Sequence, residues 1–148
     1  AEAIADPPPF SKARSAVLYD DLAKAMVHRL KYKDRTDLAM TMARWMARAG
    51  SDLLSETQAI VPVPLHRRRL VTRHYNQSAE LSRALARRAG LPHLPLDRGK
   101  EKAPALILLI DDVYTTGATV KSASKALLKA GAGDVLVLTF ARVVPAGL

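Results

Sequence analysis

The hydrophobic positions in the first part of the chain recur at the spacing of a helix. One stripe predicts a helix over Ser15–Lys33, and a second predicts a helix that begins after Thr36 and ends at Gly50. The stripes consist, in order, of Leu18, Leu22, Met26 and Leu30, and of Leu38, Met42, Trp45, Met46 and Ala49. We expect Trp45 and the methionines of these stripes to be core residues. Because no strand pattern separates the two helices, residues 1–58 are predicted to form a helical cover.

The pattern changes at Ala59, where short apolar runs begin to alternate with helical stripes. The predicted elements are a strand over Ala59–Val63, a helix from about Gln77 to Ala89, a strand over Leu106–Ile110, a helix over Ala118–Lys129 and a strand over Val135–Ala141. This order favours parallel pairing with right-handed crossovers. We therefore predict one α/β domain over residues 1–148, with residues 59–148 as its core.

The composition narrows the class of protein. With 148 residues, 49% of them hydrophobic, the chain can build one real core. No apolar run approaches the roughly 18 residues of a membrane span, and Ala1–Phe10 lacks the basic start and apolar centre of a signal peptide. We therefore expect a cytoplasmic protein without membrane insertion. The absence of cysteine excludes disulfides and thiolate metal sites in this chain.

The charge balance is strongly basic. The chain has 23 Lys and Arg against 14 Asp and Glu, for a net charge of +9. A positive field of this size attracts polyanions, which include nucleic acid, acidic membrane surfaces and phosphorylated small molecules. Charge alone does not choose among these classes, so the choice depends on a site.

The segment Leu106–Val120, LILLIDDVYTTGATV, joins a buried strand to two acids and a Thr- and Gly-rich turn. If the strand ends at Ile110, Asp111 and Asp112 emerge at its carboxyl end, pointing in different directions, where ligands bind in parallel sheets. The next helix begins with free N–H groups that suit a phosphate, and Gly117 lets the backbone approach it. The carboxylates suit sugar hydroxyls or a metal-bridged ligand. A sugar phosphate satisfies both halves of the segment.

A strand that ends in two acids is also typical of two other sites. One is a Walker B element, but no G-x-x-x-x-G-K-[ST] motif occurs upstream, which argues against an ATPase. The other is the phosphoacceptor cluster of a receiver domain, which does not explain the run Thr115–Thr119. The sugar-phosphate interpretation is therefore favoured.

At these residues the chain resembles a known family. LILLIDDVYTTGAT is similar to the phosphoribosyl diphosphate (PRPP) signature of type I phosphoribosyltransferases. VPVPLHRRRLVTRHYNQSAEL resembles the corresponding segment of the ComF (competence protein F) branch, and HRLKYKDRTDLA resembles that branch's N-terminal helical region. The resemblance covers most of Val17–Val143 in the same order. It implies a phosphoribosyltransferase-like parallel sheet flanked by helices, with an N-terminal helical hood.

The resemblance also implies a role for each residue of the site. Asp111 and Asp112 would hold the 2′ and 3′ hydroxyls of the PRPP ribose. The 5′-phosphate would be held by the backbone and hydroxyls of Thr115, Thr116, Gly117, Ala118 and Thr119. The pyrophosphate loop would consist of Leu65, His66 and Arg67. Mg²⁺ would bridge pyrophosphate and ribose oxygens without direct protein ligands, and a homodimer is common among relatives.

The implied reaction is a displacement at the anomeric carbon, in which a nitrogen nucleophile attacks and pyrophosphate leaves. Such a step needs positioning and neutralisation of the leaving charge, for which Mg²⁺ and Arg67 are candidates. Arg67 equally suits a solvated basic loop or a contact to nucleic-acid phosphate. Purine-salvage relatives have an Asp at the position of Thr115, so purine salvage is disfavoured.

The chain departs from the ComF pattern in three ways. It has Arg73-His74-Tyr75-Asn76-Gln77 where that branch usually has Arg-Gly-Phe-Asn-Gln, and it has no Cys-rich zinc ribbon. Only LPLDRGKEKAP stands where relatives have a longer segment that includes a mobile loop. Either this loop is absent from the protein or the sequence skips it near Asp97–Gly99.

The sequence supports two functions, which belong to different classes of protein. The first is an enzyme that transfers phosphoribose from PRPP to an unidentified nitrogen nucleophile. The second is a non-catalytic PRPP-binding or DNA-uptake accessory protein, with DNA or the competence machinery as partner through its basic surface. Asn76 and Gln77 suit either ligand contacts or, for Asn76, a helix cap.

Overall fold

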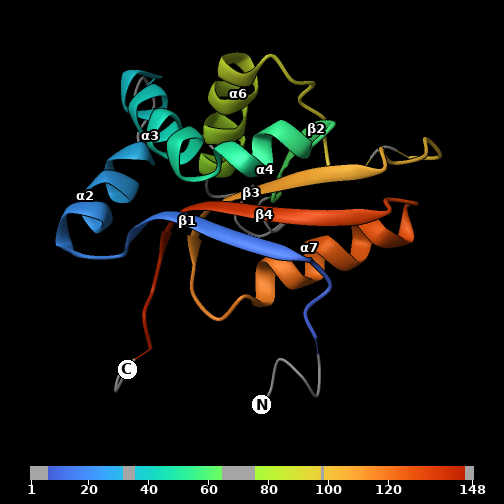
Figure 1. The fold of residues 1–148 in the computed structure, drawn as a ribbon. Helices are drawn as coiled ribbons and strands as arrows, with labels where there is room; N and C mark the ends of the chain where they lie inside the picture. Colours follow the sequence, from blue (N-terminus) through green and yellow to red (C-terminus); the bar gives the residue numbers. More distant parts are fainter. Residues whose placement is uncertain (1–6, 32–35, 65–75, 98, 146–148) are drawn as a thin grey trace.

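The apolar runs of the sequence meet in one parallel sheet (Figure 1). The computed structural model describes residues 7–31, 36–64, 76–97 and 99–145. The strands are β1 (Lys12–Leu18), β2 (Ala59–Pro62), β3 (Leu106–Tyr114) and β4 (Asp134–Arg142). They lie in the order β1-β4-β3-β2, and every neighbouring pair is parallel. The predicted α/β architecture, a parallel sheet flanked by helices, is confirmed.

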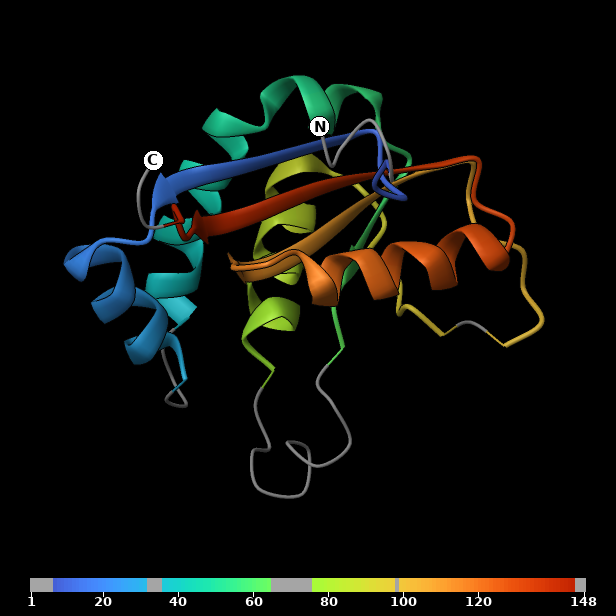
Figure 2. The same cartoon turned by 90° about the horizontal axis from the view of Figure 1, so that it is seen from below.

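Helices cover both faces of this sheet. In chain order they are α2 (Asp21–Leu30), α3 (Thr36–Ala49), α4 (Ser51–Glu56), α6 (Gln77–Ala89) and α7 (Ala118–Lys129). The helices α3, α4 and α6 lie on one face and α7 on the other, while α2 lies beyond the carboxyl end of β1 (Figures 1 and 2). In the residue ranges that the structure describes, no helix is long and apolar enough to cross a membrane.

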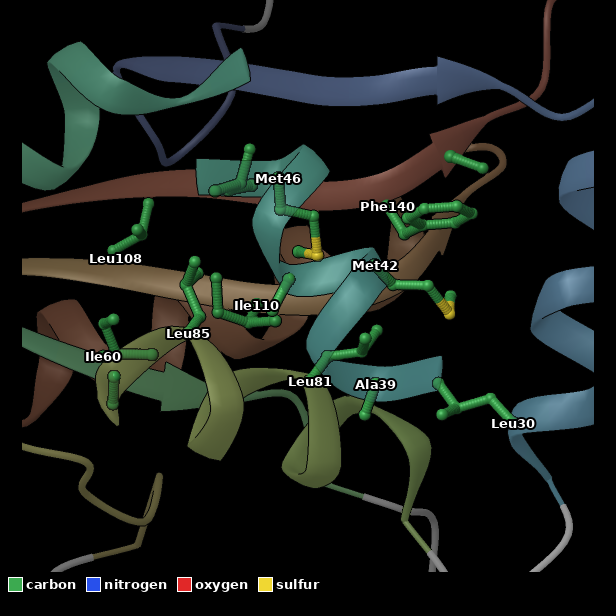
Figure 3. Close-up of a cluster of buried hydrophobic side chains, with 14 of the residues drawn as sticks. Leu30, Ala39, Met42, Met46, Ile60, Leu81, Leu85, Leu108, Ile110 and Phe140 are labelled. Carbon is green, nitrogen blue, oxygen red and sulfur yellow. The ribbon is translucent and has the colours of Figure 1, made fainter. Parts of the chain in front are cut away.

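The core consists of two clusters, one on each face of the sheet. The larger lies between the sheet, α3 and α6 (Figure 3) and includes Leu30, Met42, Met46, Leu81, Leu85, Leu108, Ile110 and Phe140. The smaller lies against α7 and includes Val61, Ile107, Leu109, Val120, Leu127, Val135 and Val137. Successive residues of β3 alternate between the two clusters, which is why this strand is apolar at every position from Leu106 to Ile110.

The strongest periodic segments fold as predicted. The helices over Gln77–Ala89 and Ala118–Lys129 have the predicted bounds, and the predicted inward residues Leu81 and Leu85 are fully buried. Gly90 ends α6 with a positive φ of 70°, as a glycine after a helix does. The strands β2 and β4 differ from the prediction by one residue at their ends.

The predicted helix over Ser15–Lys33 is wrong in its first part. Lys12–Leu18 is instead the edge strand β1, parallel to β4, and the helix starts only after Asp20, whose carboxylate accepts a hydrogen bond from the Ala23 N–H. The buried face of α2 consists of Ala23, Val27 and Leu30 rather than the predicted stripe. Leu18 and Leu22 are 52% and 64% exposed. Residues 1–58 therefore also contribute a strand to the sheet.

The helix α3 begins and ends as predicted, but Trp45 is not fully in the core. Its ring stacks on Phe140, with 6.0 Å between ring centroids, yet the residue is 37% exposed. The buried face of α3 is formed by Ala39, Met42, Ala43 and Met46. The short helix α4 was not predicted. It carries Asp52, which pairs with Arg14 of β1 and so ties this helix to the edge strand.

The order of the strands reverses between β2 and β3. After α6 the chain returns to the outer side of β2, where Ile60 and His93 form a parallel bridge. The crossover through α6 therefore runs outward from β2, whereas the crossover through α7 runs from β3 to β4 in the opposite direction. Two crossovers of the same hand that run in opposite directions place their helices on opposite faces, as α6 and α7 are placed. In such sheets the carboxyl ends of the two strands at the reversal form the ligand crevice.

We predict that Leu30→Ala lowers the free energy of unfolding by about 2–5 kcal/mol, because it empties a fully buried position. Leu22→Ala on the same helix should change it by at most about 0.5 kcal/mol, because Leu22 is exposed. Urea unfolding measures both values. Equal losses in the two variants would contradict the orientation of α2.

Candidate functional site

The two acids of the signature lie where β3 extends beyond β2. The last pair between these strands is Pro62 with Ile110, and the Val63 N–H donates to the Ile110 carbonyl at 2.8 Å. Beside β4, however, β3 continues to Tyr114. The predicted strand end at Ile110 is therefore wrong by four residues. Asp111 and Asp112 therefore belong to β3, in the stretch that pairs with β4 but no longer with β2.

Asp111 is buried and hydrogen-bonded, with 9% of its surface exposed. Its Oδ1 accepts a hydrogen bond from the Ser78 hydroxyl at 2.7 Å and another from the Asp112 N–H at 2.9 Å. Asp112 is half-buried, and its carboxylate accepts from the Val113 N–H at 2.8 Å. The two neighbouring acids thus have different surroundings.

The surroundings of Asp111 disfavour its negative charge. Burial raises the pKa of Asp111 to about 7, and the charge of Asp112 and a hydrogen bond with its side chain act in the same direction. The hydrogen bond from Ser78 lowers this pKa and offsets part of the increase. At neutral pH Asp111 is therefore near its titration midpoint, so it can accept a hydrogen bond from a hydroxyl or donate one to it.

The start of α7 lies directly after these acids. Thr115, Thr116, Ala118 and Thr119 are exposed there, and the Ala118 N–H contacts the Thr116 hydroxyl at 3.3 Å. The first turn has no acidic residue, and Gly117 at the cap provides no side-chain hydrogen bond. The helix therefore presents N–H groups and partial positive charge to solvent, which suits an anion.

Gly117 has a second structural reason to be glycine. Its φ is +86°, a conformation that other residues rarely adopt. A Cβ at this position would lie 2.4 Å from the hydroxyl oxygen of Tyr114, so the tyrosine ring covers Gly117. The sequence pattern indicated a glycine that lets a ligand approach, and it did not indicate the contact with Tyr114. Tyr114 packs on the core beside α7 and so fixes the turn.

The first residues of α6 connect this region to three other elements. Asn76 takes the second of its two suggested roles and caps the helix by accepting from the Ala79 N–H at 3.2 Å. Its Nδ2 lies 3.4 Å from the Val63 carbonyl after β2. Gln77 Nε2 donates to the Val27 carbonyl of α2 at 3.1 Å. Ser78 reaches Asp111. The sequence did not lead us to Ser78. A signal was present, because Ser78 is a polar residue on the same helix face as the buried Leu81 and Leu85.

The predicted pyrophosphate loop, Leu65, His66 and Arg67, lies outside the described residues. Two described residues before and after it, Val63 and Asn76, are in contact. In the described ranges no group of three His, Cys, Asp or Glu side chains could hold a metal ion. The expected placement of Mg²⁺ stays a prediction.

The comparisons with known proteins identify relatives. No protein-family model matches the chain. It is 30% identical to "DNA utilization protein YhgH" of Salmonella typhimurium, over 93% of this chain and 75% of that protein. It is 29% identical to "Competence protein F" of Haemophilus influenzae, over 84% and 69% of the two chains. It is 28% identical to "Competence protein ComFC" of Bacillus subtilis, over 80% of this chain and 58% of that protein, less than two thirds of its length.

Two further findings concern length and fold. The alignment with the Salmonella protein extends over 171 positions, more than the 148 residues of this chain, so the relative has residues within it that have no counterpart here. Among solved structures, orotate phosphoribosyltransferase from Aeropyrum pernix is similar, with 17% identity, a TM-score of 0.47, and coverage of 69% of this chain and 56% of that one.

We predict that Asp111→Asn stabilises the fold at neutral pH. The pKa of Asp111 in the folded protein, about 7, lies above the usual value of about 3.9, so its contribution to stability falls as pH rises from about 4 to 7. Asn retains an oxygen acceptor for Ser78 without the buried charge. The variant should exceed the native free energy of unfolding by roughly 1–3 kcal/mol at pH 8 and by less at pH 4.

Urea unfolding at a series of pH values measures this difference. The control Asp37→Asn removes an exposed acid and should change the stability by at most about 0.5 kcal/mol. A difference between Asp111→Asn and the native chain that stays constant from pH 4 to 8 would contradict the buried charge.

Proposed function

The chain belongs to the competence protein F (ComF) family, and from this premise we propose that it binds PRPP, as its Mg²⁺ complex, at the carboxyl ends of β2 and β3. One observation carries the proposal. Two acids of β3 lie beside the exposed, acid-free N-terminus of α7, at the point where the order of the strands reverses. A ligand that suits this pair of features has both hydroxyls and a phosphate.

Each half of the site binds a different part of PRPP. Asp111 and Asp112 accept hydrogen bonds from the ribose hydroxyls. The backbone N–H groups and hydroxyls of Thr115–Thr119 hold the 5′-phosphate. Mg²⁺ would be held mainly by PRPP itself near Asp111 and Asp112, and its charge would reduce the repulsion between the phosphates and these two acids.

We further propose that the protein transfers phosphoribose to a nitrogen nucleophile, as a pentosyl-transferring glycosyltransferase. The nitrogen forms a bond to the anomeric carbon, the bond from that carbon to the pyrophosphate oxygen breaks, and pyrophosphate leaves with the electron pair. The protein contributes positioning and neutralisation of charge, with Arg67 as the candidate for the latter. The acceptor is not assigned.

A second candidate function is an accessory role in DNA uptake, with PRPP binding but no turnover. The names of the relatives, competence protein and DNA utilization protein, favour it. So does a stripe of exposed lysines on α7, a helix without any acidic residue, that consists of Lys121, Lys125 and Lys129. Their spacing of four residues aligns them along one helix face, which suits the backbone of a nucleic acid. A homodimer or a competence-machinery partner belongs to this proposal as well.

We expect isothermal titration of PRPP with Mg²⁺ to give binding that weakens at least about tenfold in Asp111→Asn/Asp112→Asn, because the ribose hydroxyls lose charged acceptors. Asp134→Asn, an acid at the opposite end of the sheet, is the matched control and should bind as the native chain does. Binding that is equal in all three proteins would place PRPP elsewhere. If the native chain does not bind PRPP, the proposed function is wrong.

The DNA function predicts a different result. Replacing Lys121, Lys125 and Lys129 by Gln should weaken binding to single-stranded DNA and reduce the slope of log affinity against log salt by about 2, because three phosphate contacts are lost. PRPP binding should not change in a second variant that replaces only Lys125 and Lys129, because these two lie beyond the first turn of α7, whereas the Lys121 side chain approaches Gly117. Fluorescence anisotropy at several salt concentrations measures the slope. An unchanged slope would exclude this helix as the DNA surface.

A further inference from the structure

The contact between Ser78 and Asp111 joins two elements that are far apart in sequence. Ser78 is 5% exposed on the inward face of the first turn of α6, and its hydroxyl lies 2.7 Å from Asp111 Oδ1. The Asp112 N–H donates to the same oxygen. One carboxylate oxygen of Asp111 is thus held by two donors.

The position of Ser78 is fixed by the contacts of the two residues before it. The preceding residues, Asn76 and Gln77, are hydrogen-bonded to the Val63 carbonyl after β2 and to the Val27 carbonyl of α2. Three consecutive residues at one helix start therefore contact the residue after β2, the helix α2 and the strand β3. This arrangement places the Ser78 hydroxyl with little freedom, as a residue that orients another side chain requires.

We propose that Ser78 is a positioning residue for the sugar site, which holds Asp111 Oδ1 so that Oδ2 is presented to a ribose hydroxyl. The proposal rests on the proposed function of this site as a PRPP site. It assigns to α6 a part in the ligand site that the signature motif, confined to residues 106–119, does not contain.

The groups that face Asp111 explain why this one hydroxyl matters. On β3 the neighbouring charge is Asp112, which opposes ionisation of Asp111. On β4 the paired residue is Thr139, which is neutral and engaged with Ser15 and the Ala141 carbonyl. From α6 the contact is Ser78. Among the described residues, no Lys, Arg or His compensates the charge, so the two hydrogen bonds to Oδ1 are what favours the ionised form.

The first test measures this link in the free protein. Carbon-13 NMR titration of the Asp111 carboxyl gives its midpoint in the native chain, in Ser78→Ala and in Ser82→Ala. Ser82 is the matched control, because it is a fully buried serine one turn further along α6 that contacts His93 and the Ala79 carbonyl instead. We expect Ser78→Ala to raise the midpoint by about one pH unit, through loss of a donor to the charged form, and Ser82→Ala to leave it unchanged.

The second test measures binding of PRPP with Mg²⁺ to the same proteins between pH 6 and 9. The affinity of Ser78→Ala should be about five- to tenfold lower at pH 7. The loss should be smaller near pH 9, where Asp111 is ionised in both proteins and only its orientation differs. Ser78→Thr keeps the hydroxyl and should restore the native pH profile.

The outcomes separate the two proposals. A midpoint that does not move in Ser78→Ala, or that moves equally in Ser82→Ala, would overturn the role of Ser78. So would a loss of affinity that is the same at every pH, which a purely structural role predicts. A shifted midpoint in a native chain that binds no PRPP would support the link between Ser78 and Asp111 and overturn the proposed function.

Discussion

The site depends on the burial of one carboxylate at the point where β3 extends beyond β2. The core on both faces of the sheet requires β3 to be apolar and central, and the same strand delivers Asp111 into surroundings with little water. A buried carboxylate is unfavourable unless hydrogen bonds hold it. The Ser78 hydroxyl and the Asp112 N–H provide those bonds, and they fix the acid relative to α6 and β3. The buried carboxylate lowers the stability of the fold but is held in a defined position, a combination that is common at functional sites.

The topology explains why the two acids lie close to a helix N-terminus that suits a phosphate. The outward crossover through α6 and the opposite crossover through α7 leave the carboxyl ends of β2 and β3 side by side at the reversal of strand order. β3 then leads within a few residues to α7, so the acids and the free N–H groups of the helix start cannot be far apart. Tyr114 and Gly117 fit together in the turn and fix its shape. Carboxylates next to an anion site repel a simple phosphate, which is the reason to propose a ligand with hydroxyls and a bound cation.

Much of this arrangement could be predicted from the sequence, and the predictions that were wrong have physical reasons. The helices α6 and α7 have strong periodic patterns with a glycine after or before them, so their bounds were predictable. The strand β1 has polar residues at Lys12, Arg14 and Ser15 because it lies at the edge of the sheet. The helical spacing of Leu18 and Leu22 therefore extended the predicted helix into this strand. The partner of Asp111, Ser78, is 33 residues away, and no local pattern contains that information. The length of β3 beyond Ile110 depends on β4, a neighbour that follows later in the chain.

The measurement that tests this account most directly is a backbone amide NMR titration with PRPP and Mg²⁺. If the site is correct, the largest shifts should occur at residues 111–119, with smaller shifts at the start of α6 through Ser78, and they should require Mg²⁺. Shifts confined to the outer face of α7 would indicate a non-specific contact of an anion with lysines. Such a result, or no shifts at all, would contradict the assignment of this end of the sheet as a PRPP site.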